Sequence, residues 1–253
     1  MKSCPNCHRE IDDHNRNCPE CDSRPATPGI LGRLFGMFKP KSATDHLSRA
    51  EEAFIRNDFG GAIAAYEKAL RRDPTLVPLY QTKLAMAHQY RAEEFMRLRN
   101  ARGAIQHYSE AIRLNPASAV AWCGRGVANI RMNRIDQALA DCSEAIRLQP
   151  GYFPAYMSRA ECFYKKGELA RAIEDDSEAI RLEPENAAAY RGRGQLYELQ
   201  GAHNLAIDDF TEAIRLEPAN PHSYLLRAKA YRAIGDDAHA VADERWGGGT
   251  RGK

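Results

Sequence analysis

The chain has 253 residues, enough for one or two ordinary domains, and 43% of them are hydrophobic and 28% charged. The 36 basic and 34 acidic residues leave a net charge of +2, which by itself predicts neither a nucleic-acid nor a membrane partner. No apolar run approaches the ~18 residues of a membrane-spanning helix. The N-terminus lacks the apolar core of a signal peptide, so we expect a cytoplasmic protein.

Two close pairs of cysteines stand at the N-terminus. Cys4, Cys7, Cys18 and Cys21 follow the pattern C-x2-C-x10-C-x2-C. Such pairs suit a tetrahedral four-thiolate zinc site, and four sulfur ligands leave no open position for catalysis. Ile11 is the only large aliphatic residue between the first and last of these cysteines. We therefore expect one structural Zn2+ to organise this segment.

The cysteine pattern is similar to that of short zinc ribbons, so we assign residues 1–22 to a ribbon. A rubredoxin-like iron site is the rival, but the aromatic residues that surround that iron are absent here. We expect His8 and His14 to be solvated and not to bind the metal. Acidic residues balance the arginines around the cysteines, which is a poor electrostatic footprint for a phosphate backbone.

A basic linker covers residues 23–42. It contains Ile30, Leu31, Leu34, Phe35 and Phe38 at helical spacing, together with four basic residues and no acid. We expect it to pack on the repeats that follow or on another protein. Contact of residues 28–41 with an anionic membrane surface is the alternative, although one short amphipathic helix is a marginal anchor.

Five prolines mark a repeated unit in the rest of the chain. They are Pro74, Pro116, Pro150, Pro184 and Pro218, and the last four are spaced by 34 residues. Alanines recur twelve and five residues before each proline, and an aromatic residue recurs six residues after it. The apolar spacing within each half of a unit is helical. A period of this length indicates stacked supersecondary units that share one core.

This pattern closely resembles the tetratricopeptide repeat, a helix–turn–helix unit. The resemblance implies an all-α fold, a right-handed superhelical solenoid, over residues 43–246. We expect units at 43–76, 77–118, 119–152, 153–186 and 187–220, a partial unit at 221–246, and a disordered tail at 247–253. The second unit is eight residues longer than the others, so we expect a longer first helix that projects beyond the stack. The sixth unit lacks the final proline, and we expect its second helix to end near Trp246.

Arginines and aspartates recur in step with the last four units. Each arginine stands nine residues after one of the last four prolines, and each aspartate stands sixteen residues after the arginine. We expect four structural ion pairs: Arg125 with Asp141, Arg159 with Asp175, Arg193 with Asp209, and Arg227 with Asp243. In the alternative, the arginines stay free to bind carboxylates or phosphates.

The resemblance also implies a binding groove on the concave wall made by the first helices. Mapped onto this sequence, the groove includes Met157, Glu161, Tyr164, Arg191, Gln195, Glu198, Leu225, Lys229 and Arg232. The row mixes polar, charged and apolar residues and lacks the Lys/Asn set with which some members of the family clamp a terminal carboxylate. This mixture favours an extended peptide or a helix as the bound segment.

The sequence holds no recognisable catalytic motif. Gly247, Gly252 and Lys253 match the start of a phosphate-binding loop, but the strand and helix that such a loop needs are missing. We therefore expect no enzyme and no small-molecule substrate, but a cytoplasmic adaptor or scaffold that binds a protein partner, with the ribbon as an accessory contact. The alternatives are a nucleic-acid-associated regulator that uses the ribbon and a peripheral membrane scaffold that uses the linker.

Overall fold

The computed structural model of the chain describes residues 2–3, 10–11 and 42–248 and divides the chain into two units, Met1–Lys41 and Ser42–Lys253. In the first unit, β1 (Lys2–Ser3) pairs antiparallel with β2 (Glu10–Ile11), with Lys2 opposite Ile11. The four cysteines predicted to bind zinc, the linker up to Lys41 and the last five residues lie outside the described residues.

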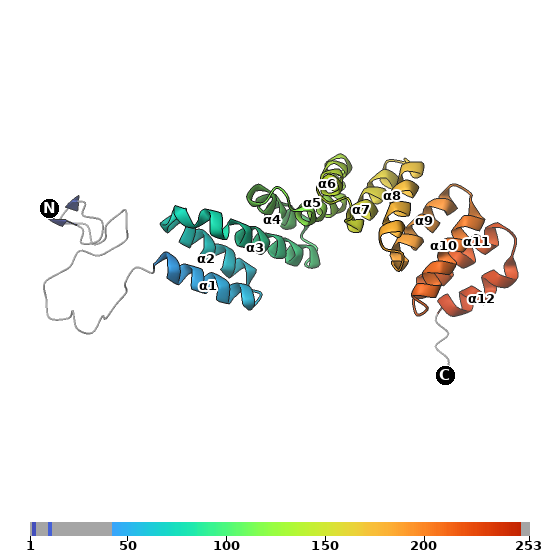
Figure 1. Cartoon of the computed structure of the whole chain (residues 1–253). Coiled ribbons are helices and arrows are strands. Elements are labelled where there is room, and N and C mark those ends of the chain that lie inside the picture. Colours follow the sequence, from blue (N-terminus) through green and yellow to red (C-terminus); the bar gives the residue numbers. More distant parts are fainter. Residues whose placement is uncertain (1, 4–9, 12–41, 249–253) are drawn as a thin grey trace, which may run out of the picture. The chain divides into compact units, whose positions relative to one another are not determined.

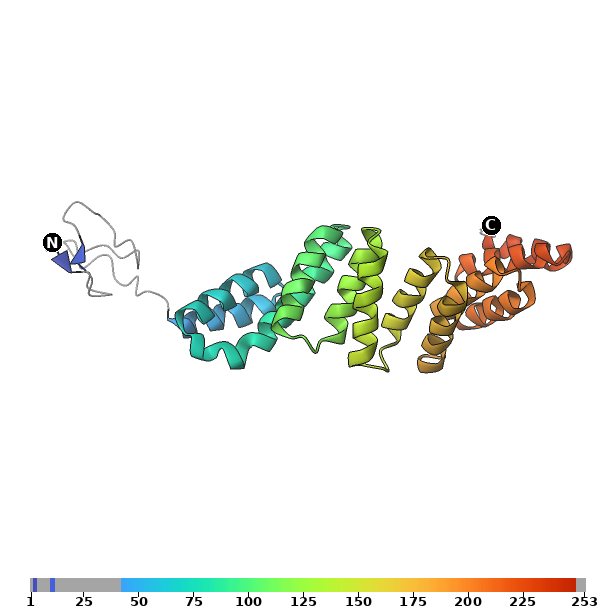
Figure 2. The same cartoon turned by 90° about the horizontal axis from the view of Figure 1, so that it is seen from above.

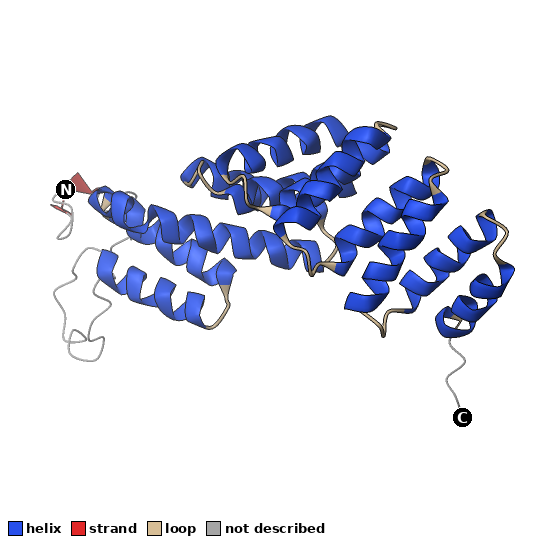
Figure 3. Cartoon of the chain, turned by 45° about the vertical axis from the view of Figure 1, so that its right-hand side comes forward, coloured by secondary structure: helices blue, strands red, loops and turns tan. Residues whose placement is uncertain are grey.

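Twelve α-helices follow one another between residues 42 and 248, arranged as six antiparallel hairpins (Figures 1 and 3). The first helices of the hairpins are α1 (Ala43–Ile55), α3 (Val77–Arg97), α5 (Ala119–Arg131), α7 (Phe153–Lys165), α9 (Ala187–Leu199) and α11 (Pro221–Ala233). The second helices are α2 (Phe59–Arg72), α4 (Ala101–Leu114), α6 (Ile135–Leu148), α8 (Leu169–Leu182), α10 (His203–Leu216) and α12 (Asp237–Gly247). A short 3-10 turn, η1 (Pro74–Leu76), precedes α3.

Each helix packs against the next one in the chain, both within a hairpin and between hairpins (Figure 2). The recurring alanines explain how the helices approach so closely. All ten are buried, at 0–1% exposure: Ala62, Ala69, Ala104, Ala111, Ala138, Ala145, Ala172, Ala179, Ala206 and Ala213. A methyl group at these contact points allows side chains of the neighbouring helix to interdigitate. The core of the second unit is therefore a series of apolar clusters between successive helices.

Each hairpin turns at a residue in the left-handed region of backbone space. Gly167, Gly201 and Gly235 have φ of 76–80°, and Asn57, Arg99 and Asn133 fill the same slot in the first three hairpins with φ of 56–59°. Glycine adopts this conformation without a steric cost, whereas a side chain adds a contact between Cβ and the backbone. Three of the six hairpins therefore carry a strained turn residue.

We expect Gly201→Ala to lower the free energy of unfolding by about 1 kcal/mol, because a Cβ is disfavoured at this φ. That Cβ would meet no atom within 4 Å, so the cost is one of backbone conformation alone. Gly151→Ala is the matched control, because its Cβ would also meet no atom within 4 Å and its φ is not positive. Urea denaturation measures both, and an equal loss of stability in the two variants would contradict the explanation.

Helix α3 is longer than the first helices of the other hairpins, as the sequence predicts, but its additional turns are packed. Tyr90 stacks on Phe59 of the first hairpin at 5.0 Å between ring centroids. Ala92 is fully buried, and Phe95 and Met96 pack on the core around Tyr108. The expectation that this segment projects beyond the stack is wrong, because its apolar side chains pack on the neighbouring hairpins.

The last hairpin ends close to the predicted position. Helix α12 extends to Gly247, and Trp246 is 73% exposed while its ring stacks on Tyr224 at 6.1 Å. Among the helices of the described residues, none combines the length and the apolar character required to cross a membrane.

Candidate functional site

The four expected arginine–aspartate pairs are all present, each with two hydrogen bonds from one guanidinium to one carboxylate. In the fifth hairpin, Arg193 donates from Nε and Nη2 to the two oxygens of Asp209 at 2.9 and 2.7 Å. The same geometry joins Arg125 to Asp141, Arg159 to Asp175 and Arg227 to Asp243. The aspartate side chains are only 7–8% exposed and the arginine side chains 17–23%. Each guanidinium is therefore committed to an aspartate of its own repeat.

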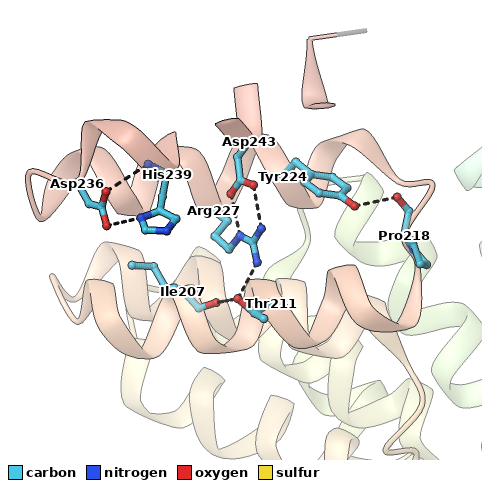
Figure 4. A network of polar contacts seen from close by, with 8 residues as sticks. All are labelled: Ile207, Thr211, Pro218, Tyr224, Arg227, Asp236, His239 and Asp243. Carbon is cyan, nitrogen blue, oxygen red and sulfur yellow. Dashed lines mark hydrogen bonds and ion pairs between the residues drawn. The ribbon is translucent and has the colours of Figure 1, made fainter. Parts of the chain in front are cut away.

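Three of the arginines also hold the preceding repeat. Nη1 of Arg227 donates to the hydroxyl of Thr211 at 2.9 Å, and that hydroxyl donates in turn to the carbonyl of Ile207 (Figure 4). Arg125 and Arg193 reach Ser109 and Ser177 in the same way, at 3.2 and 3.1 Å. Each of these arginines thus joins three helices of two successive hairpins, and we call this group an inter-repeat clamp.

The hydroxyl arm of the clamp was not predicted, although the signal was available. Ser109, Ser143, Ser177 and Thr211 stand sixteen residues before the four arginines and follow the same 34-residue period. Aromatic rings complete the clamp, since the guanidinium of Arg193 lies 5.9 Å from the ring centre of Tyr190 and 5.8 Å from that of Tyr197. The ring contacts add cation–π attraction on a side of the arginine that water would otherwise cover.

The aromatic residue six positions after three of the prolines also has a structural role. The indole nitrogen of Trp122 donates to the carbonyl of Pro116 at 2.9 Å, and the hydroxyl of Tyr224 donates to the carbonyl of Pro218 at 3.2 Å (Figure 4). Tyr156 and Pro150 make the same contact at 3.1 Å. These bonds satisfy a carbonyl at the end of one repeat with a side chain of the next, which fixes the turn between hairpins.

The second hairpin replaces the clamp with a pair of histidines. His107 occupies the slot that holds aspartate in the later repeats, and its Nδ1 lies 3.0 Å from Nδ1 of His88. His88 is 6% exposed. Burial and the neighbouring His107 lower the pKa of His88 to about 4, and burial also lowers the pKa of His107. Lys83, in the arginine slot, pairs instead with Glu51 of the first hairpin at 2.5 Å.

A cavity of about 480 Å³ opens among the first helices α7, α9 and α11. We call the surface around its opening the α7–α9–α11 face. The cavity is lined by Met157, Ala160, Glu161 and Tyr164 of α7, by Gly192, Gln195, Leu196, Glu198 and Leu199 of α9, and by Leu226 and Lys229 of α11. Asp176 of α8 also reaches it. The cavity therefore lies on the wall where the sequence predicted a groove.

Six of the nine predicted groove residues line this cavity, namely Met157, Glu161, Tyr164, Gln195, Glu198 and Lys229. The other three have contacts elsewhere. Arg191 pairs with Glu217 at 2.7 Å, and Arg232 makes two hydrogen bonds to Glu244 at 2.9 and 2.8 Å. Leu225 lies against the backbone of Gly247. These three positions share the helices of the groove but not the cavity.

Glu198 is held at the rim by a histidine and a lysine. Its carboxylate lies 2.6 Å from Nδ1 of His203 and 3.8 Å from the ammonium of Lys229, and its side chain is 8% exposed. Glu161, by contrast, is half exposed and lies 3.5 Å from Lys165. Asp176 was not among the predicted site residues, yet it is 5% exposed, and burial together with the charge of Asp175 raises its pKa to about 8.

Comparison with known protein families identifies several of the repeats. Family models of the tetratricopeptide repeat match residues 119–152 and 187–220, two of the units expected from the sequence, and a TPR-repeat model matches residues 160–201. A search of the curated proteins found no match.

Solved structures with the same architecture include MamA, which is 28% identical over 70% of this chain and 92% of its own, with a TM-score of 0.55. PilW, a type IV pilus biogenesis factor, is 22% identical over 80% of this chain and 90% of its own, with a TM-score of 0.63. A thermophilic TPR protein of Thermus thermophilus is 21% identical over 64% and 89%, with a TM-score of 0.55. Residues 119–152 and 160–220 therefore carry tetratricopeptide repeats, and the similar structures share the stacked helical hairpins of this fold.

Proposed function

We propose that this chain is a non-catalytic adaptor that binds a segment of a partner protein across the α7–α9–α11 face. The observation that carries the proposal is the cavity itself, about 480 Å³, where Met157 and Tyr164 stand beside Gln195 and Glu161. Apolar walls with a few convergent polar groups are the usual composition of a binding site. In each of the four arginine–aspartate pairs the guanidinium is bound by an aspartate of its own repeat, so the pairs stabilise the repeats and leave recognition to the cavity residues.

The test is selection of peptides on the full chain from a random library of about twelve residues, the length of an extended segment or a short helix. We expect enriched peptides to bind Tyr164→Ala at least about tenfold more weakly, since Tyr164 lines the cavity and is 47% exposed. Leu205→Ala is the matched control, because Leu205 is 49% exposed on the second helix α10. Failure to enrich any peptide, or equal weakening by both variants, would refute binding at this face.

For the N-terminal unit we propose a structural zinc ribbon over residues 1–22, with Cys4, Cys7, Cys18 and Cys21 as ligands, acting as an accessory contact. The spacing of the cysteines supports it. So does the pairing of β1 with β2, because these strands flank the first cysteine pair in the sequence. Zinc, when bound, would supply the folding free energy that a segment with one large aliphatic residue lacks.

Removal of a ligand tests the ribbon. We expect the full chain to contain one Zn2+ per molecule by native mass spectrometry and Cys18→Ser to contain none under the same conditions, because three thiolates bind Zn2+ far more weakly than four. Cys123→Ser is the control, since Cys123 is a buried thiol of α5. Full zinc content in Cys18→Ser, or none in the unaltered chain, would overturn the assignment.

A further inference from the structure

The cavity lies beside the one proline-ended repeat that places a carboxylate at a recurring core position. Eight residues before each proline, the other repeats hold Tyr66, Tyr108, Cys142 and Phe210, and all four are buried at 0–4% exposure. The fourth repeat holds Asp176 at this position. A carboxylate is much smaller than a tyrosine or phenylalanine ring, so the space that a ring fills in the second and fifth hairpins stays open here.

The opposite wall is shaped for such a ring. A Cβ on Gly124 would collide with the ring of Tyr108, so the absence of a side chain there makes room for the tyrosine. Gly192 occupies the equivalent position opposite Asp176, where a Cβ would come within 2.9 Å of the carboxylate oxygen. The fourth repeat thus keeps the space opposite the core position but supplies only a carboxyl group to fill it.

Asp176 has no hydrogen-bond partner for its carboxyl group among the described residues, although it is 5% exposed. The neighbouring aspartates differ in this respect, since Asp175 and Asp209 are each bound by an arginine. A buried carboxyl group without a hydrogen-bond partner is costly. Because the carboxyl group of Asp176 lines an open cavity, a polar or charged group of a bound molecule can reach it and supply the missing hydrogen bond.

The rest of the cavity selects the chemistry of that partner. Its walls are apolar, formed by Met157, Leu196 and Leu226. Its acidic groups are Asp176, Glu161 and Glu198, against one base, Lys229, which lies 3.8 Å from Glu198. Aliphatic walls above a buried carboxylate fit a long side chain with a terminal positive charge, because lysine and arginine bury their methylene stems and present the charge at the tip.

We propose that this cavity receives a lysine or arginine side chain of the bound partner segment, with its stem between α7 and α9 and its charge on the carboxylate of Asp176. The proposal rests on binding at the α7–α9–α11 face and adds to it the residue that the partner must present. The partner side chain takes the place that Tyr108 fills in the second hairpin.

Such binding would be linked to proton release. Burial and Asp175 hold the pKa of Asp176 at about 8, so the carboxyl group is mostly protonated at pH 7 in the free chain. A cation beside it favours the ionised form and lowers that pKa, so binding at pH 7 releases up to about one proton and tightens as the pH rises toward 8. The charged groups around Asp176 are Asp175 on α8, Arg159 and Glu161 on α7, Arg193 and Glu198 on α9, Asp209 on α10 and Lys229 on α11.

The experiment uses peptides selected on the full chain as described above. We expect one position of the selected peptides to be lysine or arginine, and replacement of that residue by norleucine, which keeps the stem and removes the charge, to weaken binding at least about tenfold. On Asp176→Asn the same replacement should have little effect. Asparagine resembles the protonated acid in shape and charge, so this variant should keep its fold. Calorimetry in buffers of different ionisation enthalpy should detect proton release with the unaltered chain only.

A second variant tests the shape argument independently. Asp176→Tyr introduces the residue found at positions 66 and 108, so we expect it to fill the cavity, raise the midpoint of thermal unfolding and abolish binding of the selected peptides.

The proposal is overturned if peptides are selected without a basic residue, or if norleucine weakens binding to the unaltered chain and to Asp176→Asn equally. In both cases binding at the face would still stand. Failure to select any peptide would refute the face and the cation together.

Discussion

Asp209→Asn should lower the free energy of unfolding by about 3 kcal/mol, the lower end of the range for removing one partner of a buried ion pair. The change leaves Arg193 with a neutral amide where a carboxylate accepted two hydrogen bonds at 2.9 and 2.7 Å. The aspartate side chain is 7% exposed and the arginine 21%, so water restores only part of the lost interaction. Urea denaturation followed by circular dichroism measures the loss.

Glu212→Gln is the matched control on the same helix. Glu212 also accepts hydrogen bonds from one arginine, Arg215, but that arginine is 63% exposed and the pair is three residues apart on the surface of α10. Exposed pairs contribute little, so we expect the denaturation midpoint of this variant to stay where it is. Comparable losses in Asp209→Asn and Glu212→Gln would show that the clamp does not stabilise the stack.

A double variant separates the pair from other effects of Asp209. In an Arg193→Met background, Asp209→Asn should cost much less than it does in the unaltered chain, because no buried charge is left without a partner. Loss of the bond between Arg193 and Ser177 should appear in the Arg193→Met single variant. Equal costs of Asp209→Asn in both backgrounds would mean that the two side chains do not stabilise each other.

Periodicity made the repeats and the ion pairs predictable. Helix ends recur with the prolines, and Arg193 and Asp209 recur at a fixed offset, so the register alone brings them together. The groove was predicted only in part, because Arg191 and Arg232 lie on the expected helices but turn to Glu217 and Glu244. Side-chain direction depends on partners in other helices, and one sequence without those helices cannot specify it.

Asp176 was missed for a different reason. The recurring arginines indicate Asp175, whereas Asp176 differs from the residues at its own position in the proline-ended repeats and belongs to no recurring pair. Alignment of that one position shows aromatic residues or cysteine in four of the five proline-ended repeats and a carboxylate only in the fourth, a local conflict between pattern and residue that often marks a functional place. The sixth repeat also holds a carboxylate there, Glu244, but Arg232 binds it. The packing of the second half of α3 was also beyond the sequence, because it depends on which neighbours cover Phe95 and Met96.

The histidine pair of the second hairpin makes stability depend on pH. Because the two Nδ1 atoms lie 3.0 Å apart, one donates and the other accepts, which requires at least one neutral ring. Burial and His107 hold the pKa of His88 at about 4, below the value of about 6.5 that it regains on unfolding. As the pH falls, His88 therefore takes up a proton in the unfolded chain before it does so in the folded chain. Stability from His88 is fully present above pH ~6.5 and is lost as the pH falls from there toward 4.

Between pH 7 and pH 5 this histidine should account for a loss of about 2 kcal/mol in the free energy of unfolding, because the unfolded chain takes up a proton over this range and the folded chain does not. We expect His88→Asn, which keeps a polar atom near the place of Nδ1, to lack this part of the acid sensitivity. His222→Asn, at an exposed position of α11, should retain it. Urea denaturation of the three proteins at both pH values gives the comparison. If His88→Asn loses as much stability on acidification as the unaltered chain, the buried pair is not the origin of the effect. The loss of stability on acidification would then come from carboxyl groups, which all three proteins have in common.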